Sequence, residues 1–145
     1  MPISTDKMIL GPWAAEQCHM VWTPHNSSCI GLIGHDGAPT AAAWFQDYSG
    51  ASIMAHIAVS GNLTPRFVAA IFDYPFRQLD AKQIVCPVVE DNTKSLSLVR
   101  HFGFKPVGRI PAWARGGDMI FFAMQRDNCK WLKGKYGQRL GITSS

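Results

Sequence analysis

The 145-residue sequence has few charged residues, few cysteines and no long hydrophobic run. Only 17% of its residues are charged, against about a quarter in an average domain. Hydrophobic residues make up 47%, which excludes an intrinsically disordered chain. No uncharged apolar run approaches the roughly 18 residues of a membrane-spanning helix, and the first residues lack the basic start and apolar core of a signal peptide. We therefore expect a single-domain, cytoplasmic protein that does not bind membranes.

The cysteines and histidines do not form a metal or redox motif. The four cysteines are Cys18, Cys29, Cys86 and Cys129, and no two of them form a CxxC pair. None of the histidines stands at a metal-ligand spacing from another histidine or from a cysteine. The sequence therefore predicts reduced, free thiols and no metal site, with Cys86 buried as a small hydrophobic side chain.

The net positive charge of the chain comes from its C-terminal end. The net charge is +4, yet residues 1–125 hold nine basic and nine acidic residues. Residues 126–145 hold five basic side chains and one aspartate. We predict one domain over residues 1–132 and a basic, glycine-rich tail over 133–145. Such a tail either binds nucleic acid or an acidic partner, or is a solvated end of the chain.

Hydrophobic periodicity and turn residues predict alternating helices and strands. The helices are expected at 12–22, 65–80 and 92–102, and the strands at 29–33, 40–47, 52–59, 83–89, 104–110 and 119–125. The first three strands form an antiparallel meander, and the strand–helix–strand unit that follows requires one parallel pairing. The expected fold class is mixed α/β, with a mostly antiparallel central sheet and helices on both faces.

Capping residues mark the ends of the later helices. Thr64 is the expected N-cap of the helix that begins at Pro65, because proline fits the first helical position. Pro75 should end or kink that helix. Gly103 is the expected stop of the next helix.

The junction between the third strand and the second helix is a candidate anion site. The segment Ser60–Arg66 is a turn that leads into a helix N-terminus, where backbone N–H groups lack helical partners and the helix dipole is positive. Such a terminus can bind phosphate, and Arg66 adds a cation. Neither a Walker loop nor a GxGxxG motif is present, and a turn with no ligand is the alternative.

A second pattern resembles a known family. The segment from Asn92 and Ser95 to Gly103-Phe104 is similar to the "N-x-x-(S/A)…G-F" segment of GNAT-superfamily acyltransferases, especially the branch that acetylates ribosomal proteins. Residues 117–126 look like the last strand of that branch, and the chain resembles small phage and prophage members. The resemblance covers about residues 52–132 and implies a GNAT fold that uses acetyl-coenzyme A as acyl donor.

The resemblance also implies the site residues. The cofactor-binding residues are expected at Val59, Ser60, Gly61, Asn62, Leu63, Thr64, Arg66, Asn92 and Ser95. His56 is the first candidate for the acid–base group, because its ordinary pKa of about 6.5 lies near neutral pH. Glu90 is the second candidate, and a backbone N–H near Val59 or Ser60 would bind the oxyanion. The alternative roles are a histidine hydrogen-bonded between strands and a carboxylate that caps a helix.

Two departures from the family pattern leave the activity open. The turn 60–66 has one glycine and a proline where the family has a glycine-rich loop, and Val99 stands where the family often has a tyrosine. We predict an N-acetyltransferase for an amine acceptor. The alternative is an inactive GNAT-fold module of phage origin that binds a host protein or nucleic acid, and a narrower alternative is modification of a nucleobase amine. The low charge and the five tryptophans predict a homodimer, with residues 119–132 at the contact.

Overall fold

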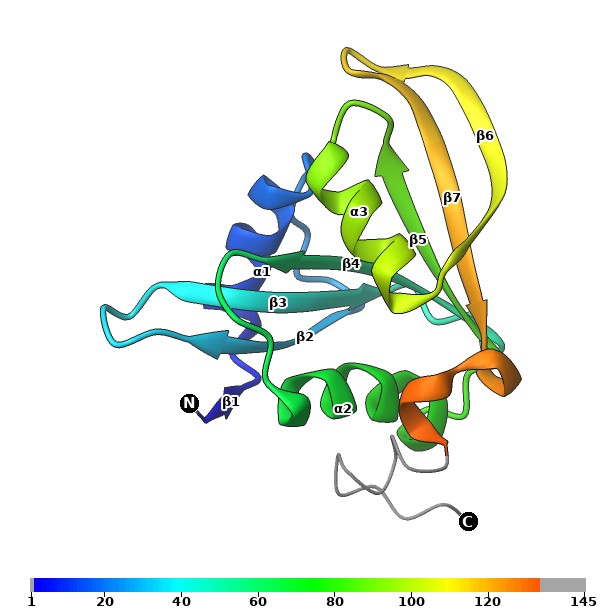
Figure 1. Ribbon diagram of the computed structural model, residues 1–145. Helices are drawn as coiled ribbons and strands as arrows, with labels where there is room; N and C mark the ends of the chain where they lie inside the picture. The colour runs from blue at the N-terminus through cyan, green and yellow to red at the C-terminus, as the bar shows by residue number, and fades with distance from the viewer. Residues whose placement is uncertain (1, 134–145) are drawn as a thin grey trace.

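The computed structural model describes residues 2–133, which form one seven-stranded sheet with helices on both faces (Figure 1). The strands lie in the order β1-β2-β3-β4-β5-β7-β6. Their bounds are β1 Ile3–Ser4, β2 Ser27–Ile33, β3 Pro39–Gln46, β4 Ser52–Val59, β5 Gln83–Val89, β6 Lys105–Ala114 and β7 Gly117–Gln125. The helices are α1 Lys7–Gln17, α2 Pro65–Asp73 and α3 Thr93–Phe102. No helix within the described residues is long and apolar enough to span a membrane.

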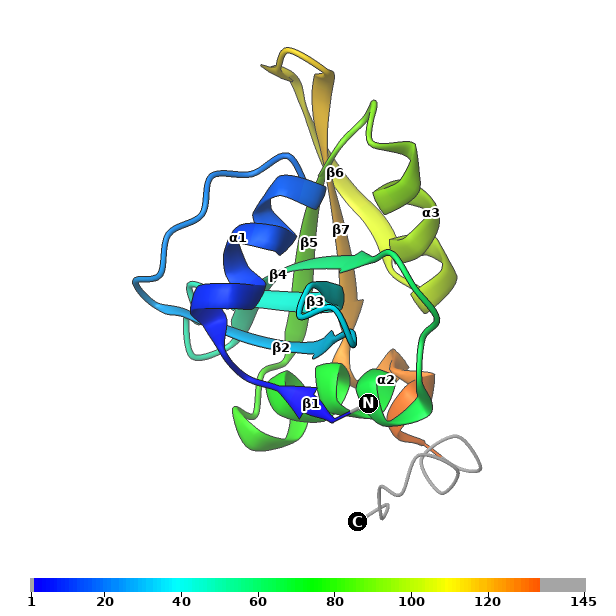
Figure 2. The same ribbon diagram turned by 90° about the vertical axis from the view of Figure 1, so that its left-hand side faces the viewer.

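The predicted sheet topology is confirmed. β2, β3 and β4 form the antiparallel meander, and β4 pairs parallel to β5. β5, β7 and β6 continue as antiparallel neighbours. Figure 2 shows α1 and α3 on opposite sides of the sheet. Alternating side chains along β3 divide the core accordingly: Ala42 and Trp44 pack with α1, whereas Ala41, Ala43 and Phe45 pack with the α2 and α3 side.

The helix ends confirm the capping predictions for α2 and α3. The Thr64 side chain accepts a hydrogen bond from the Phe67 N–H, and Pro65 is the first helical residue. The α-helix ends at Asp73, and a π-helical turn, Tyr74–Gln78, follows around Pro75. Gly103 ends α3 with a φ of 102°, a left-handed conformation that glycine adopts without strain.

The first helix was predicted wrongly at 12–22. α1 begins at Lys7, because the Asp6 carboxylate accepts a hydrogen bond from the Met8 N–H and forms the cap. Pro12 therefore lies inside the helix and not at its first turn. The packing of Leu10, Ala14 and Ala15 against the sheet compensates for the interrupted helical ladder.

The last two strands, β6 and β7, are longer than expected, and β7 lies inside the sheet. The predicted loop 111–118 is mostly strand, because β6 continues to Ala114 and β7 starts at Gly117. β7 lies between β5 and β6, so most of the segment 119–132, where the homodimer contact was predicted, belongs to an internal strand and not to a sheet edge. The exposed edge on this side is β6. Lys130–Leu132 forms a short 3₁₀ turn against α2, and residues 134–145 of the predicted tail 133–145 lie outside the described residues.

Candidate functional site

A gap between β4 and β5 is the first element of the candidate site. The two strands pair only at Ser52–Gln83, Ile53–Ile84 and Met54–Val85. Beyond these pairs they diverge, while β4 continues to Val59 and β5 to Val89 (Figure 1). The second half of β4 is still paired with β3, so only its other edge is free. The sheet therefore opens toward the C-terminal ends of two adjacent parallel strands, where ligands of α/β sheets bind.

Backbone groups of β4 face this gap. The Ser60 N–H donates to the Thr40 carbonyl of β3, at 2.8 Å, so Ser60 points away from the gap. Because successive residues of a strand direct their backbone groups to opposite edges, Ile57 and Val59 direct theirs into the gap. The Ile57 carbonyl accepts from the Cys18 thiol, at 3.7 Å, which agrees with this orientation.

The turn between β4 and α2 has free hydrogen-bond donors. The N–H groups of Ser60 and Gly61 both donate to the Thr40 carbonyl, and the Phe67 N–H donates to Thr64. In this described turn, the backbone N–H groups of Asn62, Leu63, Thr64 and Arg66 form no hydrogen bond. Pro65 has none to offer. The available anion-binding donors are thus later in the turn than the predicted Ser60 and Gly61.

His56 of β4 lies on the α1 side of the sheet. Its ring packs against Trp44 with centroids 4.6 Å apart, and only 4% of the residue is exposed. Its Nδ1 is buried without a hydrogen-bond partner. Burial lowers the pKa of His56 to about 4, although Asp47 acts in the opposite direction. The imidazole is therefore neutral at pH 7 and a weak base, and its unprotonated nitrogen can accept a hydrogen bond.

The end of α1 and the start of α3 meet inside the gap. A cavity of about 10 Å³ is lined by Cys18, His56, Ile57, Cys86 and Ser95, among others. Burial raises the pKa of the Cys18 thiol to about 12. The thiol of Cys86 is also buried, and burial raises its pKa in the same way. All four cysteines are free and Cys86 is buried, as predicted, and the other three are buried as well.

Asn92 and Ser95, both predicted to contact a cofactor, are used within the chain. The Asn92 Nδ2 group donates to the Gln17 carbonyl at 3.1 Å, and its Oδ1 accepts from the Ser95 N–H at 3.2 Å. The Ser95 side chain also lies beside the Cys18 thiol in the small cavity. Both residues are buried. Sequence reasoning did not include Cys18 or Gln17 in the site, because only the packing of α1 brings them to the gap.

Glu90 is held in an ion-pair cluster at the end of β5. Its carboxylate accepts from Arg109 at 2.9 Å and from the Asp118 N–H at 3.1 Å. Arg109 also donates to Asp118 at 2.7 Å, and this contact lowers the pKa of the Asp118 carboxyl. Both oxygens of Glu90 thus have partners, whereas the His56 Nδ1 has none. Within the described residues, no cluster of three or more potential metal ligands is present.

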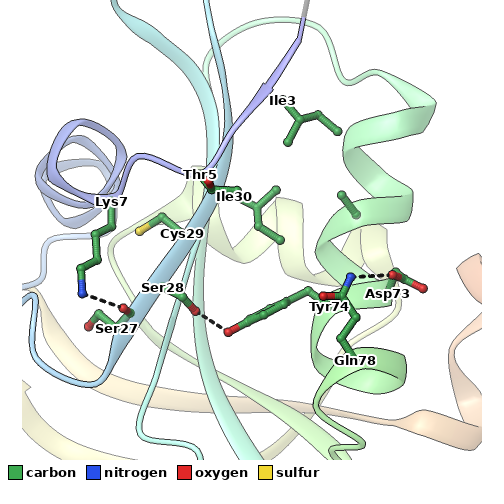
Figure 3. A pocket seen from close by; sticks show the side chains of 11 residues that line it. Ile3, Thr5, Lys7, Ser27, Ser28, Cys29, Ile30, Asp73, Tyr74 and Gln78 are labelled. Atoms are coloured by element: carbon green, nitrogen blue, oxygen red, sulfur yellow. Dashed lines mark hydrogen bonds between the residues drawn. The ribbon is translucent and has the colours of Figure 1, made fainter.

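A larger cavity, of about 440 Å³, lies between β2 and the C-terminal end of α2 (Figure 3). Most of its polar side chains are already paired within the chain. Lys7 donates to the carbonyls of Pro24 and Ser27, and the hydroxyls of Ser28 and Tyr74 are 2.8 Å apart. Because this cavity offers mainly an apolar wall and satisfied polar groups, the β4–β5 gap remains the better candidate site.

Comparisons with known proteins identify the fold. No family model matches the chain, and no curated protein matches its sequence. A point mutant of spermidine N-acetyltransferase from Vibrio cholerae superposes with a TM-score of 0.67 at 12% identity, over 90% of this chain and 98% of that chain. The same enzyme in complex with CoA and spermine gives 0.58 at 16% identity, over 72% and 68%.

A ribosomal-protein-S5-alanine acetyltransferase from Vibrio fischeri also gives a TM-score of 0.58, at 14% identity, over 72% of this chain and 64% of that chain. Identities this low establish the architecture alone. The opened parallel pair and the strand–turn–helix junction thus belong to a chain that has the fold of the GNAT acetyltransferases.

Proposed function

We propose that the protein is an acyl-coenzyme A-dependent N-acyltransferase that moves an acetyl group from acetyl-coenzyme A to an amine. The observation that carries the proposal is the continuity of the β4–β5 gap with the turn of free N–H groups at Asn62, Leu63, Thr64 and Arg66. A thioester arm needs an extended slot with backbone partners, and a pyrophosphate needs converging N–H groups at a helix N-terminus. This junction supplies both.

Each part of the donor substrate would contact a different group of residues. The pyrophosphate would accept from the N–H groups of the turn, with the exposed Arg66 side chain beside it. The pantetheine amides would pair with the free edge of β4 at Ile57 and Val59. The Val59 N–H would stabilise the oxyanion that forms when the amine attacks the thioester carbonyl. The Ser60 N–H, engaged by Thr40, is not proposed for this role.

His56 is the proposed proton acceptor, acting through a water molecule. The amine must lose a proton before or during attack, while the thiolate of coenzyme A leaves. The His56 Nδ1 has a free lone pair or proton position and lies at the inner end of the gap. Glu90 is the alternative base, although Arg109 and the Asp118 N–H occupy its oxygens. A His56→Ala protein that keeps its melting temperature should lose turnover. If turnover is lost in Glu90→Gln instead, Glu90 and not His56 is the proton acceptor.

Titration calorimetry with acetyl-coenzyme A tests the proposal directly. We expect one site per chain and roughly tenfold weaker binding for Arg66→Ala, because an exposed charge-assisted contact is partly screened. Arg77→Ala is the matched control, since it removes the same charge beyond the other end of α2. Absence of binding at millimolar acetyl-coenzyme A would contradict the proposal. If acetyl-coenzyme A binds, the acceptor is sought next. Release of the free coenzyme A thiol is measured with spermine and with a peptide that has an N-terminal alanine.

A second candidate function is a GNAT-fold module of phage origin without transferase activity, which binds a host protein or nucleic acid. It is favoured by the donors lost from the turn: Ser60 and Gly61 are engaged by β3, and Pro65 has no N–H. The sequence also holds five basic residues in 126–145, whose charge would favour an acidic partner. This candidate predicts no acetyl-coenzyme A binding, so the same calorimetry separates the two.

A further inference from the structure

We propose that the C-terminal turn of α1, Gln17 with Cys18, is a plug that closes the interior of the β4–β5 gap and withdraws when an acyl thioester enters. The inference rests on the proposed function, because it concerns how the same gap is filled and emptied. It assigns to Gln17, Cys18 and Asn92 a gating role in place of direct contact with the donor.

The Cys18 side chain occupies the opening between the two strands. It is 7% exposed, and its thiol donates to the Ile57 carbonyl, one of the two β4 residues whose backbone groups face the gap. On its other side it lies beside Ser95 of α3, which lines the same small cavity. Cys18 therefore joins helices on opposite faces of the sheet through the gap itself, and it takes the backbone acceptor that a pantetheine amide would use.

A second bond fixes the plug. Asn92 caps α3 with its Oδ1 and donates from its Nδ2 to the Gln17 carbonyl at the end of α1. The last carbonyls of a helix carry partial negative charge, so a buried amide donor there is a favourable partner. The same side chain thus stabilises the start of one helix and holds the end of another.

The remaining space is too small for the reacting group. The cavity of about 10 Å³ among Cys18, His56 and Ser95 accommodates about one water molecule. An acetyl group with its sulfur is several times larger than a water molecule. Entry of the thioester therefore requires displacement of a lining group. The strands are fixed by β3 and β7, and α3 is anchored in the core by Val99 and Phe102, which leaves the turn of α1.

The segment after Cys18 has no regular secondary structure and is held mainly by the packing of Trp22 against Trp44. Residues 19–26 form no helix or strand, and His19 and Asn26 have φ values of 58° and 54°. Val21 is 85% exposed, and the buried Trp22 Nε1 has no hydrogen-bond partner. Few regular hydrogen bonds and an unsatisfied donor mark a segment of low local stability. Withdrawal of the plug would uncover His56 and the α1 side of the gap, from which an amine could approach.

Alkylation of the cysteines, read residue by residue by mass spectrometry, tests the plug. Asn92→Asp keeps an acceptor at the cap of α3, since aspartate is as good an N-cap as asparagine, but it has no donor for the Gln17 carbonyl. We expect N-ethylmaleimide to modify Cys18 at least about tenfold faster in Asn92→Asp than in the unmodified chain, without ligand. Cys29 and Cys129, which are buried away from the gap, are the internal references.

The same measurement with saturating acetyl-coenzyme A, which has no free thiol, completes the test. Faster modification of Cys18 with unchanged Cys29 and Cys129 supports the plug. An unchanged or slower Cys18 rate, when calorimetry shows that acetyl-coenzyme A is bound, overturns it. An unchanged rate in Asn92→Asp overturns it whether or not acetyl-coenzyme A binds. If acetyl-coenzyme A does not bind but Asn92→Asp exposes Cys18, the proposed function fails. The contact of Asn92 with Gln17 then holds Cys18 in the gap, but it does not control entry of a thioester.

Discussion

His56 combines burial, an aromatic neighbour and an unsatisfied ring nitrogen in one side chain. Protonation would place a charge in the core without a partner, so the fold favours the neutral ring. The pKa of about 4 in the folded chain is below the ordinary value of 6.5. The unfolded chain therefore binds the proton more readily between these two pH values, and stability should fall as pH decreases through this window.

We predict that the free energy of unfolding decreases by about 2 kcal/mol between pH 7 and pH 5 because of His56. His56→Gln should lack this component, since glutamine does not titrate. Urea unfolding at the two pH values for both proteins provides the measurement. An equal pH dependence in His56→Gln would show that another group dominates.

The turn and first residues of α2 act as one element, because their N–H groups converge at one helix N-terminus. Leu63 contributes one of the free donors, while its side chain packs against the core. Leu63→Pro removes both the N–H and the side chain, whereas Leu63→Ala removes only the side chain. We expect Leu63→Pro to bind acetyl-coenzyme A at least several-fold more weakly than Leu63→Ala, because a phosphate contact is lost. Equal affinities by calorimetry would exclude this N–H as a contact.

At the scale of the whole molecule, β6 is the outermost strand of an arm that extends beyond the helices (Figure 1). Every residue of β6 is exposed, including Val107, Ile110 and Trp113. Pro106 and Pro111 interrupt the backbone edge, so a partner would contact side chains rather than extend the sheet. β6 is therefore a better candidate than the internal strand β7 for the contact surface of the predicted homodimer.

We expect light scattering to give twice the monomer mass, and Trp113→Ser to shift the protein toward the monomer. Apolar side chains at the centre of an interface carry most of its binding energy. Val21→Ser is the control, because Val21 is an exposed apolar residue away from β6. A monomer in the unmodified protein would contradict the dimer. An unchanged dimer in Trp113→Ser would place the contact elsewhere.

The basic C-terminal residues give a second prediction at this scale. A chain truncated after Lys133 keeps the hydrogen bond from Trp131 to the Phe102 carbonyl, 2.8 Å, and should keep its melting temperature. It loses two of the five basic residues after position 125. Any affinity for nucleic acid should be salt-dependent with a log–log slope of at most about −4 to −5 in the full chain, and shallower after truncation. An unchanged slope on heparin would assign binding to other charges.

Local signals in the sequence determined much of the fold. The strand limits at 52–59 and 83–89, the cap at Thr64 and the stop at Gly103 are all as predicted. Each depends on neighbours within a few residues: a side-chain cap, a fixed proline φ or a glycine that adopts positive φ. The position of the candidate anion turn followed from the same local features.

Tertiary packing decided how the candidate site is assembled. The sequence identified His56 and Glu90 as acid–base candidates, but only the fold shows that the His56 Nδ1 is unpartnered and that Arg109 engages Glu90. It also brings Cys18 to Ile57 and Asn92 to Gln17, pairs separated by 39 and 75 residues. Periodicity and capping report the conformation of a few consecutive residues. The divergence of β4 from β5, and the groups that fill the space between them, depend instead on long-range packing that no local pattern encodes.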